Sequence, residues 1–383
     1  MNTKALLTAL SGHGCMAVTD KKHGLSSHLI RGVVGGVPTV AVGGEQAVKE
    51  QIYGFLDAVY WHHLNEGGGT ARFIIGSGNR TVEVLRAVAT LEHALGNRLR
   101  VDVELDLNRH ALARPSFPVK IDWLRQLRAR TTMSLPPLAS RLSAEVNRES
   151  FRWYRSVSLG PWSGRLDGLQ VCEAPATGIE PIHLQVGSLG PSGAESAARR
   201  RFLELATAVG SLNHIDASNV SAMAAFLRTV ADDRDTGILA NCETEHRLEA
   251  KVLRGATVVA VNGTRLEPVV KEWPFQFPTL WSHTHGARAR YVDVLMRSND
   301  IPWVVELKVN SGGKGTYYRH AIAQVVLYRE FIRTATWIHP WFEDQGLDPQ
   351  KCQAVVAFPT EGEDPRRLRA LASLFEVKVT TLE

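Results

Sequence analysis

The hydrophobic pattern of the first third of the chain predicts strands that alternate with helices. Apolar runs with a period of two predict the strands, and apolar residues at intervals of three and four predict the helices. A Gly-Gly pair between two of the apolar runs predicts a β-hairpin. The expected strands are residues 14–20, 27–34, 37–42, 72–75 and 99–105, and the expected helices are residues 45–64 and 81–95.

The middle of the chain has a weaker pattern. It predicts basic helices, short strands near Gln170 and His183, and two helices between residues 194 and 230. A polar stretch at residues 232–236 marks its end. We therefore expect three units, which are residues 1–110, 111–235 and 236–383.

The last third predicts a small mixed sheet flanked by helices. A hairpin, a long crossover helix and a returning strand follow one another, and this order builds a mixed sheet. The sequence as a whole therefore belongs to the α/β class with mixed (α+β) sheets. The expected helices here are residues 243–253 and 316–335 and one from residue 364, and the expected strands are residues 290–297, 303–309 and 353–358 and one near Val377.

Composition indicates a folded chain without a membrane span. Apolar residues make up 44% and charged residues 22% of the 383 residues, which is the balance of a globular protein. No stretch approaches the roughly 20 apolar residues that cross a bilayer. Residues 11–14 interrupt the short apolar run at the N-terminus before a signal-peptide core forms. We therefore expect a cytoplasmic location and no membrane partner.

The charge balance is mildly basic, at 44 Lys and Arg against 39 Asp and Glu, and this favours a polyanionic partner. Arginines gather between residues 125 and 155, and an aromatic pair stands between the last two of them. Such a surface suits contact with a nucleic-acid backbone and stacking on bases, whereas a solvated helical face is the alternative. The candidate nucleic-acid contacts in this segment are Arg148, Arg152, Trp153 and Arg155.

Three charged residues stand on apolar strands of the last third. Asp293 lies between two valines, and Glu306 and Lys308 flank Leu307. Strand alternation places Glu306 and Lys308 on one face, and hairpin pairing places Asp293 beside Glu306. Two carboxylates on a half-buried face suit a divalent cation such as Mg²⁺, which prefers oxygen ligands. The alternative is a surface hairpin with an ordinary ion pair.

These residues resemble the PD-(D/E)XK nuclease superfamily. Asp293 is followed thirteen residues later by Glu306-Leu307-Lys308, and the next helix carries Gln324-Val-Val-Leu-Tyr328, similar to the Gln…Tyr element of RecB-like nucleases. The resemblance covers residues 236–383 and implies a restriction-endonuclease-like sheet. It also implies a carboxylate on the preceding helix, for which Glu245 is the candidate and Glu249, one turn later, the alternative.

The resemblance implies a Mg²⁺-dependent nuclease, with Mn²⁺ as a substitute. Asp293, Glu306 and Glu245 would hold the metal together with the backbone carbonyl of Leu307. Lys308 would orient the attacking water and stabilise the transition state.

The helix and the loop before it would complete the site. Gln324 would steady it or contact the substrate backbone, and Tyr328 would pack beneath the helix. Lys314 and Arg319 would touch phosphate, with a solvated position as the alternative for each.

The implied nucleic-acid partner is DNA, with RNA as the alternative. The implied protein partner is a second copy of the chain or a larger defence complex. A role in bacterial antiviral defence or DNA processing fits a nuclease fused to a recognition half. The competing hypothesis is a non-catalytic protein that binds nucleic acid or senses a nucleotide and carries an inactive nuclease-like domain.

The element order of residues 1–110 resembles the ribonuclease H-like fold. The loop at residues 76–79 reads Gly-Ser-Gly-Asn, where an active member would offer a carboxylate, so the resemblance implies an inert nucleic-acid platform. One alternative is a Rossmann-like sensor whose loop binds phosphate ahead of a helix, and another is a plain turn.

Overall fold

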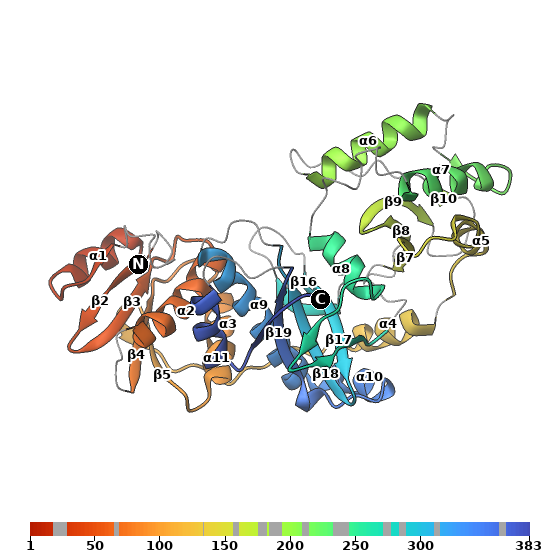
Figure 1. Ribbon diagram of the computed structural model, residues 1–383. Helices are drawn as coiled ribbons and strands as arrows, with labels where there is room; N and C mark the ends of the chain where they lie inside the picture. Colours follow the sequence, from red (N-terminus) through yellow and green to blue (C-terminus); the bar gives the residue numbers. More distant parts are fainter. Residues whose placement is uncertain are drawn as a thin grey trace.

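The protein is a mixed α/β chain, seen here in a computed structural model (Figure 1). The expected α/β class is confirmed. The structure describes residues 1–17, 29–64, 69–132, 134–155, 161–174, 182–183, 194–208, 214–232, 245–270, 277–282, 289–309, 315–359 and 365–383. Within these ranges, no helix combines the length and the apolar character that a membrane crossing requires.

The N-terminal sheet has six strands in sequential order. Its elements are α1 (Thr3–Ser11), β1 (Met16–Ala17), β2 (Leu29–Val34), β3 (Val37–Val42), α2 (Val48–Leu64), β4 (Thr70–Ile75), α3 (Thr81–Leu95), β5 (Arg100–Leu105) and β6 (Asn108–Arg109). Strands β2 and β3 form the predicted antiparallel hairpin, whose Gly35 and Gly36 have φ angles of 58° and 81°. Strands β3, β4 and β5 are parallel, and α2 and α3 make the crossovers that parallel pairing requires.

The middle segment forms an antiparallel sheet with a hydrophobic core of its own. Its elements are α4 (Ile121–Thr132), α5 (Pro137–Val146), β7 (Phe151–Arg155), β8 (Trp162–Leu166), β9 (Leu169–Ala174), β10 (Ile182–His183), α6 (Ala194–Ala208), β11 (His214–Ile215) and α7 (Val220–Asp232). The strand order is β11-β10-β9-β8-β7. The arginine- and tryptophan-bearing residues 151–155 are therefore a strand, not part of a basic helix.

The C-terminal part contains a five-stranded mixed sheet in the order β14-β17-β18-β19-β20. Its elements are α8 (Glu245–Leu253), β12 (Ala260–Val261), β13 (Thr264–Arg265), β14 (Glu267–Pro268), β15 (Phe277–Ser282), β16 (Ala289–Val292), β17 (Val294–Ser298), β18 (Ile301–Leu307), α9 (Gly315–Thr334), η3 (Thr336–Ile338), α10 (His339–Asp344), η4 (Pro349–Lys351), β19 (Gln353–Phe358), α11 (Pro365–Leu374) and β20 (Lys378–Thr381). Strands β17 and β18 are antiparallel, and β18, β19 and β20 are parallel. The hairpin, crossover helix and returning strand therefore occur in the predicted order, while the restriction-endonuclease-like fold stays a prediction.

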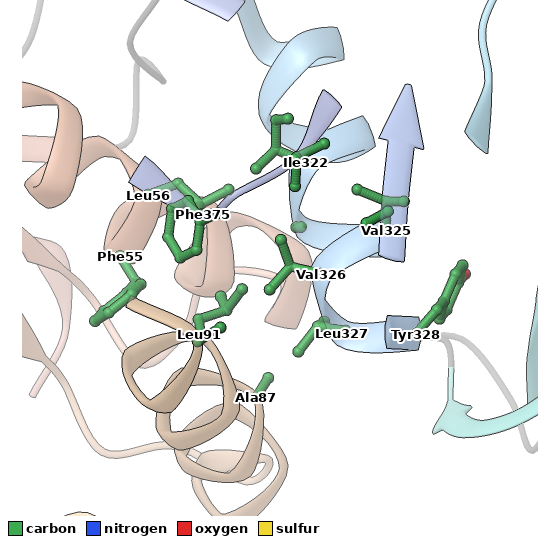
Figure 2. Packing of buried hydrophobic residues seen from close by; sticks show 14 of the residues in the cluster. Phe55, Leu56, Ala87, Leu91, Ile322, Val325, Val326, Leu327, Tyr328 and Phe375 are labelled. Atoms are coloured by element: carbon green, nitrogen blue, oxygen red, sulfur yellow. The ribbon is translucent and has the colours of Figure 1, made fainter. Parts of the chain in front are cut away.

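The N-terminal and C-terminal sheets share one hydrophobic core. Four helices form a layer between the two sheets. Helices α2 and α3 of the N-terminal part pack there against α9 and α11 of the C-terminal part. Figure 2 shows Val326 of α9 pointing toward Leu91 of α3, with Phe375 beside Leu56 of α2. All four side chains are fully buried. Residues 1–110 and 236–383, predicted as separate units, are therefore joined by a continuous apolar contact.

Candidate active site

The hairpin of β17 and β18 sets the position of the first two candidate residues. Val294 pairs with Val305, so Asp293, just before β17, lies across from Glu306. The backbone N–H of Leu307 donates a hydrogen bond of 3.0 Å to Asp293 Oδ2. The two carboxylates are therefore neighbours at the end of the hairpin, as the alternation of the sequence predicts.

Glu306 and Lys308 lie on one face of β18 and its continuation. Lys308 Nζ is 2.7 Å from Glu306 Oε1, and the two side chains are 2% and 0% exposed. The backbone of Lys308 remains tied to the sheet, because its N–H donates to Ala357 O at 3.0 Å. A buried charge is costly unless an opposite charge lies close to it, so the lysine compensates the glutamate.

Helix α8 brings two more carboxylates to the same place. Glu245, its first residue, accepts a hydrogen bond from Lys308 Nζ at 2.9 Å. Glu249, one turn later, is 2% exposed, and no described residue donates to its Oε2. Both candidates for the first carboxylate thus belong to the cluster, with Glu245 at its open side and Glu249 deeper.

The raised pKa values of the carboxyl groups in the cluster reflect burial first and crowded negative charge second. Burial and the nearby charge of Asp293 raise the pKa of Glu306 to about 8. Burial raises the pKa of Asp293 against the opposing effect of Lys308, and burial and Asp293 raise that of Glu249 well above its usual range. Burial by itself would lower the pKa of Lys308, but the carboxylates, led by Glu306, raise it. Burial and mutual repulsion therefore both disfavour the ionised carboxylates, and a bound cation would offset this cost.

The donor set suits a divalent cation with a preference for oxygen. Glu306 Oε2 and Glu249 Oε2 are buried and accept no hydrogen bond from a described residue. The ligands that fit are the carboxylates of Asp293, Glu306 and Glu245, with the carbonyl of Leu307 next to them in the chain. In the described part of the chain, no three or more acidic, His or Cys side chains are already grouped as metal ligands. The chemistry of the donors fits Mg²⁺, although the ligands are not preassembled.

Helix α9 places Gln324 and Tyr328 on one of its faces. Gln324 Nε2 donates to Tyr328 Oη at 3.2 Å, and Tyr328 is 1% exposed. The predicted packing role of Tyr328 is therefore confirmed. Among the described residues, Gln324 makes no hydrogen bond to the carboxylates, and its buried Oε1 accepts none. Its role at the site stays a prediction.

Two of the predicted nucleic-acid contacts are buried, and for these the structure corrects the prediction. Trp153 is 7% exposed, and its ring packs edge-to-face on Phe151 inside the core of the middle segment, so it cannot stack on bases. Arg319 is 4% exposed and pairs with Asp57 of α2, so it cannot reach a phosphate. Both were predicted from local sequence, which does not reveal what packs over them.

The other predicted contacts have mixed positions. Arg148 is exposed but forms a two-pronged ion pair with Asp232, at 2.7 and 2.6 Å. Arg152 lies on β7 opposite Arg165 of β8. Arg155 ends β7, but its side chain lies outside the described part of the structure, as does the whole of Lys314. Contact with a nucleic-acid backbone stays a prediction for these residues, which are Arg148, Arg152, Arg155 and Lys314.

The first three backbone amides of the loop at residues 76–79 donate hydrogen bonds within the protein. Gly76 N–H donates to Val42 O at 2.8 Å, and Gly78 N–H donates to Thr81 Oγ1 at 2.7 Å. Ser77 N–H donates to a carboxylate oxygen of Asp106 at 2.9 Å. Since Asp106 already fills the anionic position beside the loop, the phosphate-binding alternative is not supported. The ribonuclease H-like resemblance is untested by these contacts.

One residue near the cluster was not foreseen from the sequence. Arg165 of β8 acts electrostatically on Glu249 from the middle segment. The adjacent Asp167-Gly168 pair is a hairpin signal, but nothing local indicates that this hairpin meets α8.

Comparisons with models of protein families, with curated proteins and with solved structures found no match.

Proposed function

We propose that the protein is a Mg²⁺-dependent nuclease that hydrolyses phosphodiester bonds, with DNA as its substrate. The observation that carries the proposal is the Asp293–Glu306–Lys308 arrangement. Leu307 N–H binds Asp293 Oδ2 at 3.0 Å, while Lys308 Nζ lies 2.7 Å from Glu306 Oε1. Two adjacent carboxylates with a lysine at a strand end can hold a divalent cation and stabilise the negative charge that develops when a phosphodiester is hydrolysed.

Lys308 is the residue that acts on the reacting atoms. Hydrolysis forms a bond from a water oxygen to phosphorus and breaks the bond to the sugar oxygen, which takes up a proton. An ammonium held by Glu306 and Glu245 is oriented before substrate arrives, so its charge can stabilise the extra negative charge of the transition state. Gln324, on the neighbouring helix, would steady the site.

Asp293, Glu306, Glu245 and the carbonyl of Leu307 would hold the metal. When bound, Mg²⁺ supplies positive charge that offsets the charge of the phosphate. The buried, unpartnered Oε2 of Glu306 supports this assignment, because a cation would supply the partner that no described residue gives this oxygen. Mn²⁺, with similar ligand preferences, would be the substitute.

DNA is proposed over RNA on the resemblance alone. A role in bacterial defence or DNA processing, with a second copy or a larger defence complex as partner, rests on the same resemblance. In this proposal, the phosphate backbone of the nucleic acid is bound by Arg148, Arg152, Arg155 and Lys314.

A second candidate function is that of an inactive nuclease-like module that binds nucleic acid or a nucleotide. The observation that favours it is the ammonium of Lys308, which bridges Glu306 and Glu245 and gives the carboxylates a partner without a metal.

Incubation of the purified protein with plasmid DNA, linear DNA and RNA decides between the two. With Mg²⁺ we expect cleavage of DNA that EDTA abolishes and Mn²⁺ restores. Glu306→Gln should abolish cleavage while the protein stays folded. Asp300→Asn, at the exposed turn of the same hairpin, is the matched control and should cleave normally. Absence of cleavage by the wild-type protein, combined with binding of nucleic acid, would support the second candidate.

A further inference from the structure

The hairpin of β8 and β9 packs directly against helix α8 (Figure 1). Its two-residue turn is Asp167-Gly168, with φ angles of 46° and 85°. A Cβ atom placed on Gly168 would lie 2.4 Å from the carbonyl oxygen of His246, in the first turn of α8. The backbones of hairpin and helix are therefore in contact, and only glycine permits this approach.

Two further contacts hold the hairpin and its neighbouring strand to the same helix. Asp167 Oδ1 lies 3.0 Å from Arg254 Nη2, just beyond the end of α8, and the two side chains are 10% and 19% exposed. Tyr154 of β7 is buried in one hydrophobic cluster with Leu248 and Val252 of α8. The middle segment thus contacts α8 at its start, along its length and at its end.

Arg165 adds a charge to this contact. Its Nε donates to Ser163 Oγ at 3.2 Å and its Nη1 to Gly168 O at 3.1 Å, so the guanidinium is fixed to the hairpin. From there its positive charge acts on Glu249, which is otherwise surrounded by Asp293, Glu245 and Glu306.

We propose that the β8–β9 hairpin positions α8 for the reaction, with Gly168 and Arg165 as the positioning residues. The inference rests on the proposed nuclease function, because α8 carries Glu245 and Glu249. Gly168 sets how close the helix start lies, and Arg165, bonded to Gly168 O, braces that turn while its positive charge acts on Glu249. The middle segment is thereby a structural part of the active site, and the site is incomplete without it.

Gly168→Ala tests the contact with a single methyl group. The matched control is Gly36→Ala in the β2–β3 hairpin, where φ is 81° and the added Cβ meets nothing within 4 Å. Both variants place an alanine at a similar positive φ angle, but only the first one pushes on α8. Amide hydrogen exchange of residues 245–253 reports the helix directly and needs no activity.

We expect Gly168→Ala to raise the exchange rates in α8 about tenfold or more and to lower kcat by up to about 10²-fold with KM little changed, since small misplacements of reacting groups cost this much. Gly36→Ala should change neither quantity. Arg165→Ala should lower kcat in the same way, and Arg165→Lys should restore part of it by keeping the charge. This second pair of variants serves if Gly168→Ala does not fold.

The outcomes separate the two proposals. Unchanged α8 exchange in both Gly168→Ala and Arg165→Ala overturns the positioning role, whatever the activity. If the variants show faster α8 exchange but the wild-type protein does not cleave nucleic acid, the contact is structural. Both its catalytic consequence and the nuclease proposal are then overturned. If Arg165→Ala raises KM and leaves kcat unchanged, the arginine acts in substrate binding, and its positioning role is overturned.

Discussion

Arg319 near the start of α9 forms a buried ion pair with Asp57 in the middle of α2. Both side chains are at most 5% exposed. Among the described residues, none accepts a hydrogen bond from Arg319 Nε or Nη2, so the carboxylate is the main compensation for the guanidinium. The neighbouring residues Tyr53 and His320 are also hydrogen bonded across the same two helices. The helix that follows the Lys308 strand is thereby fastened to the N-terminal sheet.

We expect Arg319→Met to lower the free energy of unfolding by about 3–5 kcal/mol, because it removes the buried guanidinium that pairs with the buried carboxylate of Asp57. The double variant Asp57→Leu/Arg319→Met should be close to the wild type, since apolar residues replace both charges. Urea unfolding of the two single variants and the double variant measures the coupling. As a control, Arg128→Ala removes a half-exposed pair with Asp344 and should cost less than about 1 kcal/mol. Additive losses in the double variant would contradict the expectation.

Lys308→Met should change how the fold responds to Mg²⁺. Without the ammonium, Glu306 loses its close partner and stability should fall by about 3–5 kcal/mol. Added Mg²⁺ should then raise Tm more in the variant than in the wild type, because the cation takes over the missing positive charge. Thermal unfolding with and without Mg²⁺ measures this, and Lys351→Met, at a half-exposed pair on η4, is the control. An equal Mg²⁺ effect in variant and wild type would mean that the cluster binds no metal.

Trp153→Ala should act on stability, not on base stacking. The ring fills the core of the middle segment, so its removal should cost about 3–5 kcal/mol of unfolding free energy. Trp153→Phe should cost less because it keeps an apolar ring. Denaturant unfolding gives the first quantity, and binding of single-stranded and duplex DNA by the folded fraction gives the second. A selective loss of single-strand affinity at unchanged stability would restore the stacking interpretation.

Glu45→Gln should make the stability of the fold less sensitive to acid. Although burial opposes the shift, hydrogen bonds from Thr3 lower the pKa of Glu45 to about 2. A carboxyl group with a lowered folded-state pKa stabilises the fold above its unfolded pKa of about 4.3, and this contribution disappears as the pH falls toward 2. Wild-type Tm should therefore fall more steeply than that of Glu45→Gln between pH 5 and pH 2. Parallel Tm curves would show that the Thr3 contact contributes nothing to stability.

The sequence was most informative where short-range rules apply. A period of two and a short turn were enough to bring Asp293 opposite Glu306 and to place Lys308 on the same face, because hairpin pairing is local. The helix with Gln324 and Tyr328 followed from apolar spacing in the same way. These elements include most of the candidate site.

Long-range packing could not be read from the sequence. Arg319 and Trp153 resemble surface residues by type and neighbours, and only the contacts with α2 and with the middle core bury them. Arg165 escaped notice for the same reason, since its relation to Glu249 depends on how a hairpin of one sheet meets a helix of another. Patterns along a chain report which side of an element is apolar, not which element covers it.

The helical layer that both sheets share has a consequence for any attempt to divide the protein. A chain cut after residue 110 would leave Leu56, Leu91 and their neighbours facing water, and the remaining piece would expose Val326 and Phe375. Each fragment would therefore tend to aggregate by itself. Co-expressed, the two would be expected to find each other and reassemble, as a split reporter does, because the faces they expose are complementary.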